Sequence, residues 1–354
     1  MNFSDTLTVW YAENARNLPW RETKDPYKIW LSEVILQQTR VQQGMPYYLS
    51  FLKAYPTVQD LAHASEQEVL KRWQGLGYYS RARNMLKAAR MVVEAYDGVF
   101  PHTYSELIKL KGVGDYTASA VASFCFDEPV AVLDGNVFRV LARYYGWEAP
   151  INTPAGKKLF KQKADEVLDK DRPGLHNQAI MEFGALQCKP RSPDCQACPL
   201  RDSCTAFQLG KVAQLPVKLK KVKVKKRHLN YLVFQSGEKN LLIQKRVKKG
   251  IWKNLFEFPV LETAQNITVS QLKEQSDWLQ LGEGREYAIQ RFYPKVVKHQ
   301  LSHQTLFIQF WVIAIDQGFF SELPLDTTHQ VVSSKEIKTF PVPVVIQYFL
   351  EEFL

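Results

Sequence analysis

The stretch ELIKLKGVGDYTASAVASF, residues 106–124, predicts two helices joined by a tight turn. Gly112 and Gly114 stand one residue apart at its centre, and two such glycines let the backbone turn sharply and approach a ligand closely. The amides that open the second helix point outward at its positive end, where an anion can bind. Because the same pattern also occurs in ordinary helix–helix turns, the anion site is an expectation that depends on the rest of the chain.

Helical periodicity extends outward from this hairpin over most of the first part of the chain, where apolar residues recur three and four positions apart between glycine and proline breaks. The character then changes, because seven of the ten residues from Lys218 to Arg227 are Lys or Arg. Such a run is typical of a solvated linker, although it can also bind an acidic partner. We expect a helical domain over 1–210 and a basic linker over 211–227.

Strand patterns dominate residues 228–354. Residues 228–235 and 241–246 flank the turn SGEKN and predict a hairpin. Residues 306–314 are apolar at nearly every position, which predicts a strand covered on both faces, and residues 344–354 predict a closing helix. We therefore expect a smaller α+β domain behind the mainly α domain.

The composition of the 354-residue chain limits the class of protein. Apolar residues make up 45 % and charged residues 23 %, which suits a globular protein and argues against disorder. No window has the ~18 uninterrupted apolar residues of a membrane helix, and the N-terminus lacks a secretory pattern. We therefore expect a cytoplasmic protein without a membrane partner, associated with the nucleoid if it is bacterial. The net charge of +10 favours an anionic partner, with nucleic acid ahead of a membrane surface.

Four of the five cysteines lie close together with the spacing C-x6-C-x2-C-x5-C, at Cys188, Cys195, Cys198 and Cys204. Clustered thiols in a reducing compartment favour metal ligation over disulfides. Structural zinc sites usually present two close pairs of ligands, whereas only one Cys-x-x-Cys pair occurs here. The unequal loops suit an iron–sulfur cube, whose corners lie farther apart than the ligands of one ion. We expect an iron–sulfur cluster, with zinc as the alternative.

Asp134 follows a short apolar run and precedes an amphipathic helix in PVAVLDGNVFRVLARYYG, residues 129–146. An aspartate in this place is the usual helix cap and in most proteins does nothing more. Hydrogen bonds from the helix amides and the helix dipole also hold a capping carboxylate ionised. Such a fixed anion can stabilise a developing cation.

Glu33 interrupts a helix that is apolar on nearly every side, in PYKIWLSEVILQQTRVQQ, residues 26–43. A lone glutamate usually lies on the surface, but the apolar turns on both sides predict a buried one. Desolvation raises the pKa of a buried carboxyl and keeps it partly protonated, as a general acid requires. A protonated Glu33 with an ionised Asp134 is the pairing that cleaves glycosidic bonds. The basic balance and the hairpin favour a nucleoside bond over a sugar–sugar bond.

Five features carry a resemblance to a known family: LSEVILQQTRV (31–41), GLGYYSRARN (75–84), LKGVGDYTA (110–118), VLDGNVFRVL (132–141) and the cysteine spacing. Together they resemble the adenine-specific mismatch DNA glycosylases, within the helix–hairpin–helix glycosylase superfamily. The resemblance implies an N-terminal helix–hairpin–helix glycosylase domain, made of a six-helix barrel module and an iron–sulfur module. It also implies a Nudix-like C-terminal domain that recognises 8-oxoguanine.

The resemblance implies a function in base excision repair. Adenine paired with 8-oxoguanine or guanine in double-stranded DNA would be flipped into a pocket and released by hydrolysis of its N-glycosidic bond. Glu33 would protonate adenine N7 and Asp134 would stabilise the sugar cation, with Tyr116 and Asn136 supporting the site. The four cysteines would bind a [4Fe-4S] cluster. We expect a monomer.

Tyr116 separates this family from the related bifunctional glycosylase/lyases, which place a lysine here and cut the strand through a Schiff base. A phenol cannot form that Schiff base, so we expect base removal without strand cleavage. Two alternatives remain open: an endonuclease III-like glycosylase/lyase, and a non-catalytic iron–sulfur protein that binds DNA. The second would need no pair of carboxylates.

The resemblance also implies residues that contact DNA and the base. For DNA and the lesion they are Gln37, Gln38, Thr39, Tyr78, Gly112, Gly114, Ser302 and His303. For the adenine pocket they are Trp20, Arg16 and Gln178. Gln38 and Tyr78 match residues that wedge into the base stack beside 8-oxoguanine. By themselves, a Gln-Gln-Thr run and a Tyr-Tyr pair also suit ordinary surface and core positions.

The C-terminal domain resembles the Nudix-like fold through GIWKNLFEFP, residues 250–259. It lacks the acidic box of Nudix hydrolases, because a single Arg285–Glu286 pair is all that approaches that box. We therefore expect no metal-dependent pyrophosphate hydrolysis.

Overall fold

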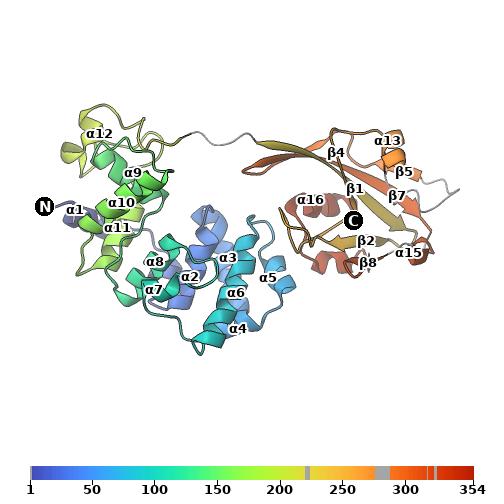
Figure 1. Ribbon diagram of the computed structural model, residues 1–354, viewed down its shortest axis with the longest axis horizontal. Helices are drawn as coiled ribbons and strands as arrows, with labels where there is room; N and C mark the ends of the chain where they lie inside the picture. The colour runs from blue at the N-terminus through green and yellow to red at the C-terminus, as the bar shows by residue number, and fades with distance from the viewer. Residues whose placement is uncertain (1, 220–223, 276–287, 317, 323–324) are drawn as a thin grey trace. The chain divides into compact units, whose positions relative to one another are not determined.

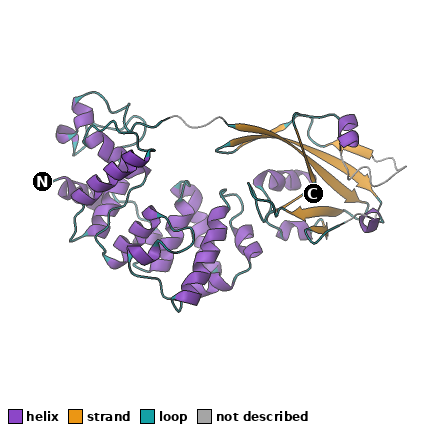
Figure 2. Ribbon diagram, in the orientation of Figure 1, coloured by secondary structure: helices purple, strands orange, loops and turns teal. Residues whose placement is uncertain are grey.

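The structure is a computed structural model of the chain and describes residues 2–219, 224–275, 288–316, 318–322 and 325–354. By its internal contacts the chain divides into two compact units. The first comprises Met1–Ala64 with Arg83–Lys221, and the second comprises Ser65–Ala82 with Val222–Leu354. Helices make up the first unit and a sheet dominates the second (Figure 2), which confirms the predicted fold class.

The first unit is a set of helices joined by short loops (Figure 1). They are α1 (Phe3–Asn14), η1 (Pro19–Arg21), α2 (Pro26–Leu36), α3 (Val41–Ala54), α4 (Val58–His63), α6 (Ser80–Ala95, which begins within the second unit), α7 (Tyr104–Leu107), α8 (Asp115–Phe126), α9 (Gly135–Tyr144), α10 (Pro154–Val167), α11 (Pro173–Leu186), η2 (Arg201–Ser203) and α12 (Thr205–Gln208).

Two central helices of the first unit position the residues of interest. Asp25 caps α2 by accepting a hydrogen bond from the Tyr27 amide (2.9 Å). From Tyr27 to Ile35 nearly every residue of α2 is buried, because this helix packs against α3 and α8. Helix α11 in turn packs against α1, α8 and α9. A helix surrounded in this way carries its polar side chains into the interior, which is the setting predicted for Glu33.

The helix–turn–helix at 106–124 has a shorter first helix than the sequence predicted. Helix α7 ends at Leu107, and hydrogen-bonded turns carry the chain on to Val113. Gly112 has φ +80°, and a Cβ there would lie 2.5 Å from the Cβ of Asn84, so both the conformation and the space require glycine. Gly114 then precedes α8 in an extended conformation.

The second unit is built on one mixed sheet. Its described strands are β1 (Lys225–Ser236), β2 (Asn240–Lys245), β3 (Phe256–Glu257), β4 (Val260–Thr263), β5 (Ala288–Arg291), β6 (Val297–Gln300), β7 (Gln304–Ile315) and β8 (His329–Ser333). The order is β3-β2-β1-β7-β5, with β4 on β1, β6 on β7 and β8 on β2. Strand β1 runs parallel to β7 and antiparallel to β2. The pairing of Gln235 with Leu241 confirms the predicted hairpin.

Helices cover both faces of this sheet, as predicted for the strand at 306–314. On one face, side chains of β1 and β7 pack against Leu272 of α13 (Val269–Gln275) and Phe319 of α15 (Phe319–Glu322). On the other face, Phe349 of α16 (Val344–Phe353) stacks on Phe310 at 4.3 Å between ring centres. Helix α16 confirms the predicted closing helix. A short 3-10 helix, η3 (Glu336–Thr339), precedes it.

Residues 65–82 belong to the second unit by their contacts, and we call this segment the arm. It contains helix α5 (Glu66–Arg72). Gln74 accepts a hydrogen bond from the Val342 amide (3.2 Å) and donates one to Gln347 (2.7 Å). Sequence reasoning did not anticipate this grouping, because the partners of the arm lie far away along the chain.

The predicted domain limits 1–210, 211–227 and 228–354 stay a prediction. Residues 220–223 of the predicted linker and the Arg285–Glu286 pair lie outside the described residues. Strand β1 begins before the predicted end of the linker. Within the part of the chain that the structure describes, no helix combines the length and the apolar character that crossing a bilayer requires.

Candidate active site

A cavity of about 530 Å³ opens in the first unit, and its volume is typical of small-ligand sites. Helices α2, α8 and α11, the start of α9 and the segment before α2 contribute to its lining. The predicted site residues in the lining are Arg16, Trp20, Glu33, Thr39, Tyr116, Asp134, Asn136 and Gln178. The structure thus brings the predicted catalytic residues and the predicted base pocket together, while their roles stay predictions.

Glu33 reaches the cavity from α2 and is only 7 % exposed. Its Oε2 accepts a hydrogen bond from the Tyr116 hydroxyl at 2.6 Å. Burial raises the pKa of Glu33 to about 7, the nearby Asp134 adds to this rise, and the Tyr116 hydrogen bond and the charge of Arg21 oppose it. The carboxyl can therefore carry a proton near neutral pH, as a general acid must.

Tyr116 is the second residue of α8, and its hydroxyl also lies 3.9 Å from the sulfur of Met181. Burial, together with the charges of Glu33 and Asp134, raises the pKa of the phenol well above its ordinary value. The phenol therefore stays neutral and acts as a hydrogen-bond donor to Glu33.

Asp134 caps α9, as predicted. Its Oδ1 accepts hydrogen bonds from the amides of Asn136 and Val137, both at 2.8 Å, and its Oδ2 accepts one from the Asn136 side chain at 2.7 Å. The Oδ1 of Asn136 accepts in turn from Arg139 (2.9 Å), whose Nε donates to the carbonyl of Cys188 (2.8 Å). A continuous set of hydrogen bonds thus orients the carboxylate and leads to the first cysteine of the cluster.

The pKa of Asp134 shifts in the opposite direction to the one expected from the sequence. Capping was expected to favour the ionised form, but burial raises the pKa of Asp134, and the hydrogen bonds from Val137 and Asn136 only oppose that rise. The side chain is half-buried by its exposed area, yet protein atoms surround its carboxylate closely. The sequence could not show this crowding. Burial therefore raises the pKa of both carboxyls, and the predicted division of roles between Glu33 and Asp134 stays a prediction.

The residues of the predicted adenine pocket are held by their neighbours. Trp20 is 8 % exposed and packs edge-on against Tyr48, with 5.1 Å between the ring centres. The side-chain oxygen of Gln178 accepts a hydrogen bond from the Tyr11 hydroxyl at 2.8 Å. These contacts fix an apolar ring and an amide on the wall of the cavity, a combination that suits a flat heterocyclic base.

Sequence reasoning missed four charged residues in the lining, Arg21, Arg40, Arg139 and Glu182. Glu182 follows Gln178 by four positions on α11, so the two lie on the same face of that helix. Arg21 directly follows Trp20. Helical spacing could have identified Glu182, whereas nothing in the sequence links it to Arg21, which lies 161 positions away.

Gln38 and Tyr78, the predicted wedge residues, both have left-handed backbone conformations, with φ +56° and +48°. Both are exposed, Gln38 in the first unit and Tyr78 in the arm. A non-glycine residue in this region is costly unless its surroundings hold it, and such residues gather at functional sites. Beside Gln38, the side-chain amide of Gln37 donates to the Thr117 hydroxyl (3.2 Å), and Thr39 lines the cavity.

Ser302 and His303 lie exposed in the turn between β6 and β7. The Leu301 amide donates to the Gln304 carbonyl at 2.8 Å and closes this turn. The hydroxyls of Ser302 and Tyr78 form a short hydrogen bond within the second unit. Two residues predicted to contact the lesion are therefore neighbours, although they are 224 positions apart.

Helix α8 opens the predicted anion site after Gly112 and Gly114. Its first residue, Asp115, accepts a hydrogen bond from the Tyr104 hydroxyl at 2.7 Å. The amides of the first turn can face a phosphate. The phosphate-binding role of the two glycines stays a prediction.

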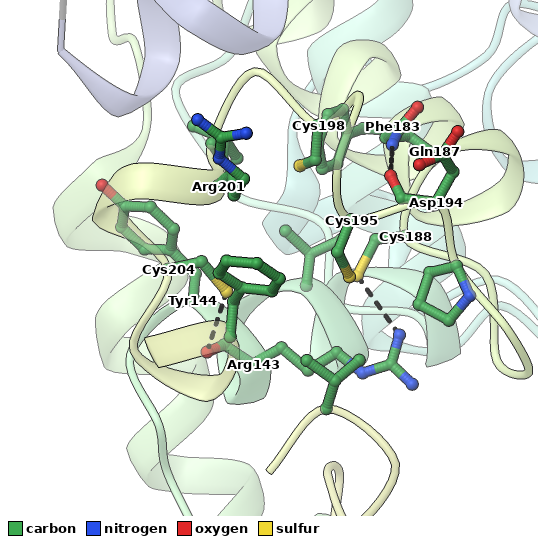
Figure 3. A pocket seen from close by; sticks show the side chains of 15 residues that line it. Arg143, Tyr144, Phe183, Gln187, Cys188, Asp194, Cys195, Cys198, Arg201 and Cys204 are labelled. Atoms are coloured by element: carbon green, nitrogen blue, oxygen red, sulfur yellow. Dashed lines mark hydrogen bonds between the residues drawn. The ribbon is translucent and has the colours of Figure 1, made fainter. Parts of the chain in front are cut away.

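The four clustered cysteines all line one pocket of the first unit, separate from the cavity described above, which Figure 3 shows from close by. None of the four forms a disulfide bond. Arg143 reaches the sulfur of Cys188 (3.4 Å) and donates to the Lys189 carbonyl (2.7 Å). Burial raises the pKa of the Cys198 thiol to about 11, so thiolates here need the charge of a metal centre to hold them.

This donor set fits a cluster better than a single ion. Across the described ranges, no three Cys, His, Asp or Glu side chains lie close enough together to hold one metal ion. Four thiols around one pocket suit the separated corners of an iron–sulfur cube.

Comparisons with family models agree with this geometry. Residues 31–167 match the HhH-GPD superfamily of base excision DNA repair proteins. Residues 188–204 match the iron–sulfur binding domain of endonuclease III, and residues 230–352 match the NUDIX domain.

Individual relatives agree as well. The chain is 36 % identical over 321 residues to an adenine DNA glycosylase of Buchnera aphidicola subsp. Baizongia pistaciae, which covers 90 % of this chain and 88 % of the relative. It is 43 % identical to the human adenine DNA glycosylase over 60 % of this chain and 41 % of the relative. The solved structure of a thermostable thymine-DNA glycosylase aligns with a TM-score of 0.55 at 29 % identity, over 58 % of this chain and 95 % of the other.

Proposed function

The chain belongs to the adenine DNA glycosylase family, and we propose that it removes adenine from double-stranded DNA by hydrolysing the bond between the base and its deoxyribose. One observation carries this proposal: Glu33, which can hold a proton near pH 7, and the capped Asp134 line the same cavity. Two carboxyls with different protonation are what glycosidic bond cleavage requires.

The reaction begins when the target nucleotide leaves the base stack and enters the cavity. Glu33 donates its proton to N7 of adenine, while the hydrogen bond from Tyr116 orients the carboxyl. The bond between C1′ and N9 then breaks, and its electron pair leaves with the base, so adenine departs as a neutral molecule. The Asp134 carboxylate stabilises the cation that remains on the sugar. Water adds at C1′ and gives up a proton, which returns Glu33 to its acid form.

Base removal without strand cleavage follows from the residue at the head of α8. A glycosylase that also cuts the strand needs an amine to form a Schiff base with the sugar. Tyr116 supplies a neutral phenol that is already bonded to Glu33. The abasic site therefore stays intact until another enzyme or alkali breaks it.

Adenine paired with 8-oxoguanine or guanine is the proposed substrate. The contact between Tyr78 and Ser302 supports a reading surface on the second unit, since both side chains are exposed. The left-handed backbone of Tyr78 is consistent with a side chain held ready to enter the base stack. Gln38 has the same conformation in the first unit.

The cofactor is a [4Fe-4S] cluster on Cys188, Cys195, Cys198 and Cys204. The four thiols would hold the cluster within the loop of residues 188–204, and none of the chemical steps above would pass through it. Arg143 contacts this loop through the Cys188 sulfur and the Lys189 carbonyl. We propose further that the protein acts as a monomer in the cytoplasm.

One assay tests the function and its alternatives. Purified holoprotein is incubated with end-labelled duplexes that carry adenine opposite 8-oxoguanine, opposite guanine or opposite thymine. We expect free adenine from the first two duplexes and strand breaks only after alkali. Strand breaks without alkali would instead indicate a glycosylase/lyase, and binding without release of adenine would indicate a non-catalytic DNA-binding protein.

A further inference from the structure

One wall of the cavity carries a buried carboxylate between two partly exposed arginines. Glu182 of α11 is 1 % exposed and lies between the guanidinium groups of Arg16 and Arg21. Arg16 donates to it through Nε (2.7 Å), Nη2 (2.6 Å) and its backbone amide (3.0 Å). Arg21 donates through Nη1 (3.0 Å) and Nη2 (2.8 Å). We call Arg16, Arg21 and Glu182 the charge triad.

The two arginines of the charge triad hold the Glu182 carboxyl in its ionised form. Burial alone would raise the pKa of Glu182, but the hydrogen bonds from Arg16 and Arg21 outweigh burial and lower it to about 2. The hydrogen bond to Glu182 likewise raises the pKa of Arg16. Near neutral pH, Glu182 therefore places a negative charge between the guanidinium groups of Arg16 and Arg21.

These charges share the cavity with Glu33. Positive charge near a carboxyl favours its ionised form, and Arg21 already lowers the pKa of Glu33 against the larger effect of burial. The other ionisable groups that face Glu33 or line the cavity with it are Tyr116 and Cys125 of α8, Asp134, Arg16, Arg40 and Arg139. Glu182 lines the same cavity and accepts two hydrogen bonds from Arg21, so it is placed to offset the charge of that arginine.

We propose that Glu182 is a positioning residue for the acid step: it holds Arg16 and Arg21 against α11 and compensates their charge, so that Glu33 keeps its proton. This inference deepens the proposed adenine glycosylase function and rests on it. An ion pair that served only to join α11 to the segment before α2 would contribute to folding stability but would not govern the protonation of Glu33.

The rate of adenine release as a function of pH distinguishes the two roles. Glu182→Gln keeps the size and a hydrogen-bond acceptor of the side chain but removes its charge. The alkaline midpoint is the pH at which the single-turnover rate has fallen to half because Glu33 has lost its proton. An uncompensated positive charge roughly 10 Å from Glu33 lowers this midpoint by about one pH unit. Release at pH 7.5 should then fall about eightfold, and it should return to nearly the wild-type rate at pH 5.5.

Three further variants control this experiment. Glu182→Gln combined with Arg21→Gln restores the charge balance and should move the midpoint back toward the wild-type value. Glu182→Asp keeps the charge on a shorter side chain and should retain the wild-type midpoint. Glu166→Gln breaks an exposed ion pair with Lys163 on α10 and should leave the midpoint unchanged.

A second readout needs no substrate. Carbon-13 NMR of glutamate-labelled holoprotein follows the titration of the Glu33 carboxyl directly, with its signal identified by its absence in Glu33→Gln. The titration midpoint should fall in Glu182→Gln and recover in the double variant. An unchanged midpoint in Glu182→Gln, or a double variant that does not recover, overturns the inference. A midpoint that shifts in a protein that releases no adenine would support the inference while refuting the proposed function.

Discussion

Replacing Glu33 with Gln should stabilise the protein above pH 5 while abolishing adenine release. The pKa of Glu33 rises from an ordinary value of 4.5 to about 7 in the folded protein. The folded state therefore binds more protons than the unfolded state between these two values, so the free energy of unfolding falls as the pH rises through this window. The full cost, reached above pH 7, is about 3 kcal/mol. Gln cannot ionise and can still accept the hydrogen bond from Tyr116.

The assay is denaturant unfolding of the full-length holoprotein at several pH values, with the same optical probe for both proteins. The stability advantage of Glu33→Gln over the wild type should grow from about 1 kcal/mol at pH 5 to about 3 kcal/mol at pH 8. The matched control is Glu13→Gln, which removes an exposed carboxyl from α1 and should give a flat difference. A difference for Glu33→Gln that does not change between pH 5 and pH 8 would refute the reasoning that burial keeps this carboxyl protonated.

Four other changes test individual contacts. Asp134→Asn should abolish adenine release but leave mismatch binding largely intact in a gel-shift assay; retained turnover would mean that the carboxylates are misassigned. Asn177→Ala removes buried hydrogen bonds to the backbone just before Asp134 and to Ser123, so the free energy of unfolding should fall by about 2 kcal/mol. A fall of only a few tenths of a kcal/mol in denaturant unfolding would show that these hydrogen bonds do not hold the segment before Asp134. Ser302→Ala should reduce the preference for adenine opposite 8-oxoguanine over guanine in competition kinetics, and an unchanged ratio would count against a reading role. Cys198→Ala should abolish the brown colour of the purified protein and lower its iron content. A colourless wild-type protein that contains zinc would contradict the assignment of an iron–sulfur cluster.

Local patterns were the most predictable part of this molecule. The cap at Asp134 was predicted because a carboxylate one residue before an amphipathic helix has helix amides as its nearest donors. The burial of Glu33 was predicted because apolar residues surround it on both neighbouring turns of α2. The spacing of the cysteines predicted that they would share one pocket, since short loops keep the thiols together.

Contacts between distant segments were not predictable in the same way. Glu182 bonds to Arg16 across 166 positions, and no periodicity links the two. Gln74 of the arm forms hydrogen bonds with Val342 and with Gln347 of α16, so the arm belongs to the second unit by its contacts. The helical pattern of the sequence had placed the arm in the first domain. The direction of the pKa of Asp134 was also missed, because it depends on how many protein atoms surround the carboxylate.

The amino-acid sequence by itself determined which chemical groups are present and how each sits on its own helix or turn: an acid within an apolar helix, a capping carboxylate, a hairpin of glycines and a set of closely spaced thiols. These features depend on neighbours within a few residues, where backbone geometry leaves few alternatives. Only the tertiary structure decided that Glu33 and Asp134 open onto one cavity, and that two arginines and a glutamate share its wall. Burial and charge at a site are sums over every segment that folds around it, and such sums have no local signature.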